Sequence, residues 1–124
     1  MGSPLMNQRH QMFLLDDVLD VGRLGHWSAF AGQDRDDWAA VLASAHALAV
    51  QYFAPHHRLG DVQEPHLHEG KVVLPAAVET ALSAYASAGF NAAAAPVAQG
   101  GMGLPYVIAL ASDGLFMAAN IATS

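Results

Sequence analysis

The sequence predicts an all-α fold, a small up-and-down bundle of about four helices. Apolar residues recur at intervals of three and four in four segments, which is the period of a helix that buries one face. Glycine or proline flanks these segments, as is usual at helix ends. The 124 residues suffice for one domain, and 53% hydrophobic against 13% charged residues exclude an intrinsically disordered chain.

The first predicted helix runs from Met12 to about Val21, and Gly22 follows as its stop. Aspartates occupy one side of this segment. The opposite side is expected to face the core, and it consists of Leu14, Val18 and Val21, with Leu15 and Leu19 beside them.

The linker that follows this helix is too rich in aromatic side chains to be a solvated tether. We expect Trp27 and Phe30 to pack onto the core. Helix and linker together form an N-terminal extension, residues 6–33, ahead of the main helical domain at 34–124. Residues 1–5 are expected to be a remnant of an expression vector or a disordered start, with Met6 as the native first residue.

The second predicted helix begins at Asp34, Asp36 and Asp37, because carboxylates there accept free backbone N–H groups and favour the helix dipole. Pro55 ends it. Its buried stripe is expected to comprise Trp38, Val41, Leu42, Ala45, Leu48, Ala49, Tyr52 and Phe53.

A polar stretch over 56–73 separates the second helix from the third. A short hairpin or an extended loop is expected near 67–74. The third helix opens at Pro75, a favourable first-turn residue, and closes at Gly89. Its buried stripe is expected to comprise Val78, Ala81, Leu82, Tyr85 and Ala88.

The fourth predicted helix starts at Leu104-Pro105 and runs to about Asn120, after a passage that Pro96 and a glycine cluster break. It is apolar on nearly every face, and two other long helices cannot enclose it on all sides. We therefore expect an exposed stripe at a symmetric interface of a homodimer. The residues of this candidate interface are Val107, Ile108, Leu110, Leu115 and Phe116.

Composition excludes several classes of protein and site. A net charge of −6 with only five Lys and Arg lacks the basic footprint of a nucleic-acid-binding protein. The absence of cysteine excludes disulfides, Cys–zinc sites and thiol catalysis. No apolar run reaches the roughly 18 residues of a membrane span, and the start does not resemble a signal peptide, so we expect a cytoplasmic protein.

Candidate chemical sites are weak. His56, His57, His66 and His68 lie close in sequence, but they lack helical zinc-ligand spacing, so solvated loop histidines and no metal site are expected. The Gly100–Gly103 cluster precedes a helix but matches no phosphate-binding motif, and a packing role is expected. The sequence therefore assigns no catalytic, cofactor-binding or metal-binding residue.

Several segments, in order, resemble the acyl-CoA dehydrogenase family, in the large branch that includes long-chain and 3-methylmercaptopropionyl-CoA dehydrogenases. The main motif is GGMGLPYV at 100–107 with AAN at 118–120, which resembles the family's G-G-x-G-L-P-[YH]-V … A-N segment. The supporting segments are FLLDDVLD at 13–20, APHHRLGD at 54–61, EGKVVLP at 69–75, AGFN at 88–91 and AP at 95–96. The resemblance covers nearly the whole chain after the first few residues.

The resemblance implies that the chain is one domain of a larger enzyme. Enzymes of this family, which act in fatty acid metabolism, have an N-terminal helical domain, a β-barrel domain and a C-terminal four-helix domain, with FAD between the last two and a catalytic glutamate beyond the segment matched here. Residues 34–124 are thus expected to be an N-terminal helical domain or fragment of such a flavoenzyme. This chain alone is expected to bind no FAD and to be non-catalytic. Its partner would be a missing barrel and C-terminal chain or a second copy of itself.

Three departures from the family pattern leave an alternative open. The chain has PVAQ at 96–99 in place of a carboxylate-bearing P-E-E run, Met102 in place of Gln, and Asp113-Gly114 in place of Asn-Glu. A glycine inside a helix costs about 1 kcal/mol relative to alanine. These changes also fit a stand-alone helical interaction or oligomerisation module derived from the same scaffold.

Overall fold

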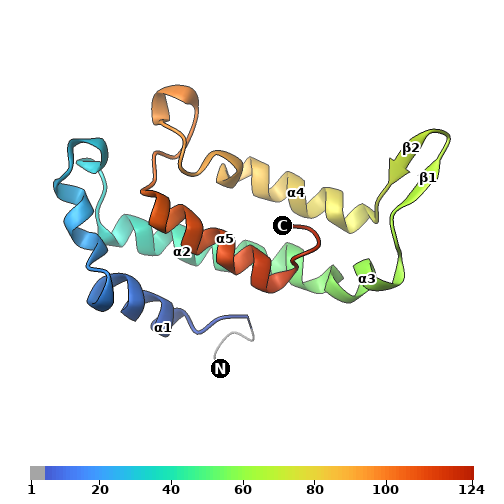
Figure 1. The fold of residues 1–124 in the computed structure, drawn as a ribbon, viewed down its shortest axis with the longest axis horizontal. Coiled ribbons are helices and arrows are strands. Elements are labelled where there is room, and N and C mark those ends of the chain that lie inside the picture. Colours follow the sequence, from blue (N-terminus) through green and yellow to red (C-terminus); the bar gives the residue numbers. More distant parts are fainter. Residues whose placement is uncertain (1–4) are drawn as a thin grey trace.

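The structure is a computed structural model that describes residues 5–124. Its five α-helices and one small antiparallel hairpin confirm the predicted all-α class (Figure 1). The expectation for residues 1–5 lies, apart from Leu5, outside the described residues. The elements are α1 (Gln8–Phe13), α2 (Arg35–Leu48), α3 (His57–Val62), β1 (His66–His68), β2 (Lys71–Val73), α4 (Ala76–Ser87) and α5 (Tyr106–Ala119).

Helix α2 is the central element, and its start is fixed by a capping box. The Asp34 side chain accepts from the Asp37 N–H at 2.9 Å, and the Asp37 side chain accepts from the Asp34 N–H at 3.0 Å. A π-helical turn, Ala49–Phe53, continues α2 toward Pro55. Its expected stripe is confirmed, since Trp38, Leu42, Ala45, Ala49 and Phe53 are buried and Val41, Leu48 and Tyr52 pack beside them.

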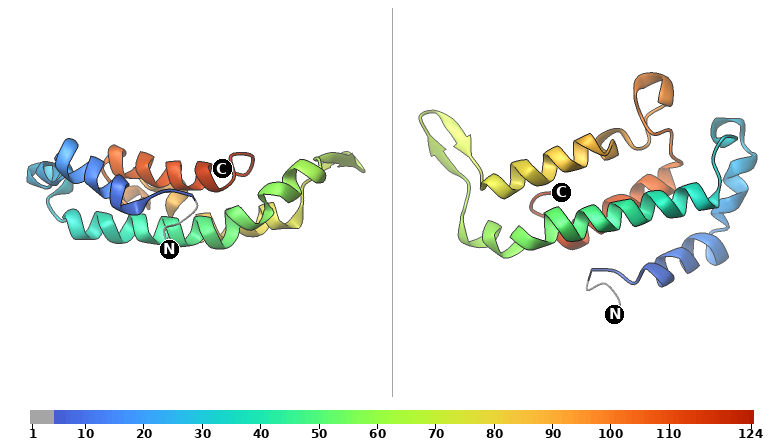
Figure 2. Two further views of the ribbon diagram at one scale, coloured as in Figure 1. Left: turned by 90° about the horizontal axis from the view of Figure 1, so that it is seen from below. Right: turned by 180° about the vertical axis from the view of Figure 1, so that it is seen from behind.

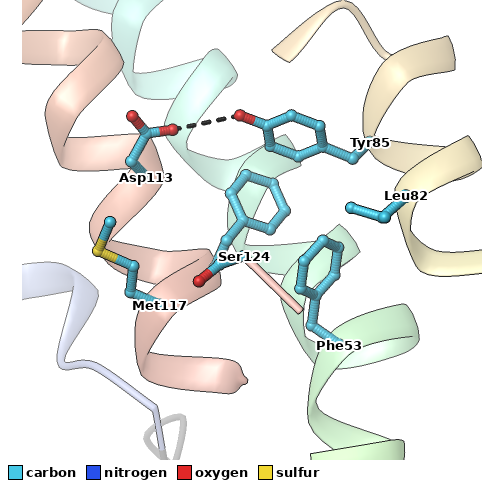
Figure 3. A pocket seen from close by; sticks show the side chains of 7 residues that line it. Phe53, Leu82, Tyr85, Asp113, Met117 and Ser124 are labelled. Atoms are coloured by element: carbon cyan, nitrogen blue, oxygen red, sulfur yellow. Dashed lines mark hydrogen bonds between the residues drawn. The ribbon is translucent and has the colours of Figure 1, made fainter. Parts of the chain in front are cut away.

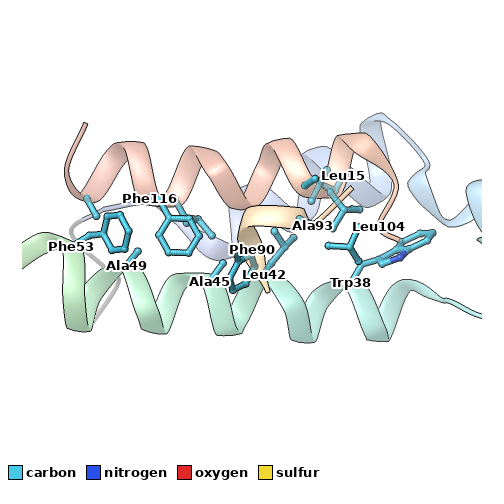
Figure 4. Close-up of a cluster of buried hydrophobic side chains, with 14 of the residues drawn as sticks. Leu15, Trp38, Leu42, Ala45, Ala49, Phe53, Phe90, Ala93, Leu104 and Phe116 are labelled. Atoms are coloured by element: carbon cyan, nitrogen blue, oxygen red, sulfur yellow. The ribbon is translucent and has the colours of Figure 1, made fainter. Parts of the chain in front are cut away.

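Helix α5 lies along α2, and the two helices run in the same direction (Figures 1 and 2). The core lies between them (Figure 4). Phe116 of α5 has its ring centroid 4.9 Å from those of both Phe53 and Tyr85, and 5.3 Å from that of Phe90. Tyr85 comes from α4, so this aromatic cluster joins three helices.

Polar contacts fix both ends of the α2–α5 pair. At one end, the Gln33 amide accepts from Trp38 Nε1 at 2.8 Å and donates to the Gly103 carbonyl at 2.7 Å. At the other end, Asn120 Nδ2 donates to the Phe53 carbonyl at 3.2 Å. These buried or half-buried bonds set the register of α5 on α2, because sliding either helix would leave polar groups unpaired.

A short hairpin and an extended loop were the two alternatives expected near 67–74, and the structure contains the hairpin. β1 and β2 pair antiparallel, with Leu67 opposite Val72, and the turn places Glu69 and Gly70 at φ 49° and 76°. Two central residues with positive φ are typical of tight hairpin turns. The hairpin follows α3, a helix inside the stretch expected to be polar loop, and it projects from one end of the molecule (Figure 2).

The prediction for the first helix is wrong in its register. Helix α1 begins at Gln8, and a π-helical turn, Leu14–Val18, follows it. The wider turn rotates later residues relative to a regular helix. Consequently Leu15 and Val21 are buried, whereas Leu14 and Val18 are exposed.

The linker prediction is half right. Phe30 packs against the core, but Trp27 is 63% exposed. Trp27 has extended backbone between two 3-10 turns, Val21–His26 and Ser28–Phe30. The tryptophan that is buried in the core is Trp38, and its Nε1 donates a hydrogen bond to the Gln33 side chain.

The third and fourth helices begin and end as expected, within a residue or two. Gly89 adopts the left-handed conformation, φ 89°, that ends α4. In the predicted stripe of α4, Ala81 is buried and Val78 and Tyr85 are half-buried, but Leu82 and Ala88 are exposed. The exposed positions arise because α4 contacts its neighbours along only a narrow face.

Gly101→Ala should destabilise the protein by about 1–3 kcal/mol, because a Cβ there would overlap the carbonyl group and Cβ of Ala95. Gly32→Ala is the matched control, since no atom lies within 4 Å of its Cβ position. Its unfolding free energy should change by no more than about 0.5 kcal/mol. Urea unfolding followed by circular dichroism measures both, and equal effects would contradict the close packing of this loop.

Candidate functional site

The strongest candidate site is a cavity of about 210 Å3 between α4, α5 and the end of α2 (Figure 3). Aromatic and aliphatic side chains form most of its wall, and a carboxylate and two hydroxyl groups lie at its edge. The lining residues are Phe53, Leu82, Tyr85, Asp113, Phe116, Met117 and Ser124. The cavity is therefore suited to an apolar group rather than to a phosphate or a metal ion.

Tyr85 and Asp113 form the polar edge of the cavity. The Tyr85 hydroxyl donates to Asp113 Oδ1 at 3.4 Å (Figure 3). Burial raises the pKa of Tyr85 above its usual value, and the charge of Asp113 and this hydrogen bond raise it further. At neutral pH the phenol therefore stays protonated and acts as a hydrogen-bond donor.

The remaining hydroxyl group at the cavity is occupied locally. Ser124 Oγ donates to the Ile121 carbonyl at 3.2 Å. Within residues 5–124 no cation pairs with Asp113, and no lining residue is a histidine that could activate a nucleophile. The arrangement can bind an apolar group, and it offers one carboxylate that is hydrogen-bonded to a phenol whose pKa is raised.

The candidate interface residues of the fourth helix do not share one surface. Ile108, Leu115 and Phe116 are buried inside the chain against α2 and α4. Val107 is half-buried, and only Leu110 is exposed, at 53%. The prediction of a common exposed stripe is therefore wrong for the three buried residues, because a single chain already covers that side of α5.

Other residues form the outward face of α5, and sequence reasoning missed them. Tyr106 is 71% exposed and Met117 is 49% exposed, while Ile121 follows the helix and is also exposed. With Leu110 they recur at intervals of four, seven and four residues. That periodicity was visible in the sequence, but choosing the outward side of an apolar helix requires knowing where α2 lies.

The histidines are dispersed. His56 is buried, and a hydrogen bond of 2.8 Å joins its Nε2 to Thr123 Oγ1, which ties the C-terminal turn to the end of α2. His57 is exposed on α3, and His66 and His68 are exposed on β1. In the part of the chain that the structure describes, no three His, Cys, Asp or Glu side chains are grouped to hold a metal ion.

The glycine cluster before α5 packs against its own chain. Gly100 and Gly103 have positive φ, and Gly101 contacts Ala95 closely. Val97 lies 3.0 Å from the Cβ position of Gly103. These contacts give the loop a structural explanation.

Every helix among residues 5–124 is too short or too polar to cross a lipid bilayer.

Comparison with known proteins gives one distant relative. The chain is 26% identical over 113 residues to a 3-methylmercaptopropionyl-CoA dehydrogenase from Ruegeria pomeroyi. The match covers 91% of this chain but 19% of that protein, so the chain spans about a fifth of the relative's length. No protein-family model and no solved structure matches. The chain is thus distantly related to one segment of an acyl-CoA dehydrogenase.

The phenol of Tyr85 should titrate at higher pH than a free tyrosine. Replacing the other two tyrosines, in Tyr52→Phe/Tyr106→Phe, leaves Tyr85 as the only phenol, whose ionisation is read by ultraviolet absorbance. Asp113→Asn in that background should lower the pKa of Tyr85 only part of the way, because burial is the largest cause of the shift.

The same shift predicts the sign of a stability change. The folded state favours the neutral phenol, so this contribution is fully present below pH about 10 and is lost as the pH rises through the folded-state pKa. Tyr85→Phe should remove that part of the alkaline loss of unfolding free energy. An unchanged alkaline profile in Tyr85→Phe would contradict the assignment.

Proposed function

We propose that this chain is the N-terminal helical domain of an acyl-CoA dehydrogenase-like flavoenzyme, and that it supplies a helical wall and contact surfaces rather than reacting groups. The observation that carries the proposal is the extent of the sequence match, which covers 91% of this chain but only 19% of the relative. In this proposal the flavin and the catalytic base belong to the rest of the enzyme.

The positions of the family-like residues support this proposal. Leu104, Pro105 and Asn120 are buried, and Asn120 bonds the end of α2. Gly89 and Gly101 occupy places where a side chain would be strained or would overlap a neighbour. These five family-like residues help to place α5, its preceding loop and the end of α4, which is expected of a shared scaffold.

The residues of the α4–α5 cavity do not suit FAD. A flavin diphosphate needs cations or several backbone N–H donors. The one charged group at this cavity is the carboxylate of Asp113, which would repel a diphosphate. We therefore assign no flavin contact to these residues, and no reaction step is placed in this chain.

The purified full chain, supplied with FAD, should not reduce an artificial electron acceptor when acyl-CoA thioesters of different lengths are added. The Ruegeria pomeroyi enzyme in the same assay is the positive control. Acyl-CoA-dependent turnover by the chain alone would contradict the proposal that the reacting groups lie elsewhere.

A chimera tests whether this chain can serve as the N-terminal helical domain of such an enzyme. Replacing the matching segment of the Ruegeria pomeroyi enzyme with this chain should give a protein that retains FAD and measurable dehydrogenase activity. The same chimera with Gly101→Arg is the control, because it disrupts the packing of the loop on Ala95. A folded chimera that binds no FAD would instead favour the stand-alone interaction module.

A further inference from the structure

The cavity between α4, α5 and the end of α2 combines buried aromatic rings with an opening to solvent (Figure 3). Its most buried lining residues are Phe53 and Phe116, which are 0% and 1% exposed and belong to the core. Leu82 and Met117 also line it and are 43% and 49% exposed. A ligand can therefore enter from solvent and place an apolar group against rings that the fold holds in position.

The side-chain hydrogen-bond donors at this cavity are already used within the chain. The Tyr85 hydroxyl donates to Asp113 Oδ1 at 3.4 Å, and Ser124 Oγ donates to the Ile121 carbonyl at 3.2 Å. Asp113 Oδ2 accepts no hydrogen bond from residues 5–124. The lining side chains therefore offer a ligand only acceptors, namely the Asp113 carboxylate and the lone pairs of two hydroxyl oxygens.

Charge at the cavity points in the same direction. The Asp113 carboxylate forms no salt bridge with any residue in 5–124. Burial and Asp113 raise the pKa of Tyr85, so the phenol remains a donor to Asp113 at neutral pH and presents its lone pairs to a ligand. The chain as a whole carries a net charge of −6, which attracts cations rather than anions.

We propose that this cavity binds a small organic ammonium ion, with its apolar body against Phe53 and Phe116 and its N–H groups directed at Asp113. A primary ammonium group carries three donors and no acceptor, so it complements an edge that offers only acceptors. Its hydrogen bond to a carboxylate is charge-assisted and therefore stronger than that of a neutral group. Aromatic rings also attract a cation that approaches their faces.

The size of the cavity limits the ligand to about one ring with a short arm. An apolar protein cavity of about 150 Å3 holds benzene. The present cavity, at about 210 Å3, has room for a benzene ring and a short alkyl chain that ends in the ammonium group. Phenethylamine, which is protonated at neutral pH, is a suitable probe.

Calorimetric titration of the full chain at pH 7 with three probes of similar shape tests the class of ligand. Phenethylamine should bind about 10-fold more tightly than phenethyl alcohol, because only the amine forms a charge-assisted bond with Asp113. Hydrocinnamate, which places a carboxylate near Asp113, should bind more weakly than the alcohol. Absence of phenethylamine binding, or equal affinity for amine and alcohol, would overturn the proposal.

Asp113→Asn tests the group that confers this preference. Asparagine keeps a carbonyl oxygen that can accept from Tyr85, so the fold should be retained, but the amine and the alcohol should then bind with similar affinity. Asp17→Asn is the matched control, since it removes the same charge from an exposed position in the turn after α1. A preference for the amine that survives in Asp113→Asn, or that is equally lost in Asp17→Asn, would contradict the assignment.

Filling the cavity tests where the probe binds. Leu82→Trp should weaken phenethylamine binding at least 10-fold, because the larger side chain occupies the space of the ring. Leu67→Trp on the hairpin is the control, since Leu67 is 72% exposed and lies outside the cavity, and it should bind as the wild type does. Equal affinities of these two variants would overturn the location. The proposal is independent of the flavoenzyme assignment, because the chimera measures FAD content and activity, whereas these titrations measure amine binding by the chain itself.

Discussion

The packing of α5 along α2 is the constraint on which the rest of the structure depends. Phe116 contacts the rings of Phe53, Tyr85 and Phe90, so one side chain of α5 links α2, α4 and the turn after α4. Hydrogen bonds from Gln33 and Asn120 fix the two ends of the pair. Burying each of these aromatic side chains stabilises the fold by about 1.5–3 kcal/mol. The hydrogen bonds fix how far α5 can slide along α2, because a shift would leave buried polar groups unpaired.

This packing also determines which surfaces remain free. Helix α5 buries one side on α2 and turns Asp113 toward α4, so its remaining side has no charged residue and stays exposed. The α4–α5 cavity opens between two helices that the chain leaves partly uncovered. In the proposed flavoenzyme, the rest of the protein would cover these surfaces.

Elements governed by local rules could be predicted from the sequence. The start of α2 at Asp34, the end of α4 at Gly89 and the buried stripe through Trp38 follow from capping and helical periodicity. The burial of Leu15 rather than Leu14 could not be predicted, because a π-helical turn has no clear sequence pattern. The outward face of α5 required knowing which side α2 covers, since periodicity alone does not distinguish the sides of an apolar helix.

Native-state hydrogen exchange tests the central role of the α2–α5 pair most directly. If the pair is the cooperative core, the amides in the middle of both helices should be the most protected and should exchange with a common opening free energy, while those of the β1–β2 hairpin exchange much faster. An α5 that exchanges as fast as the hairpin, with α2 still protected, would show that α5 is not part of the core and would contradict the account.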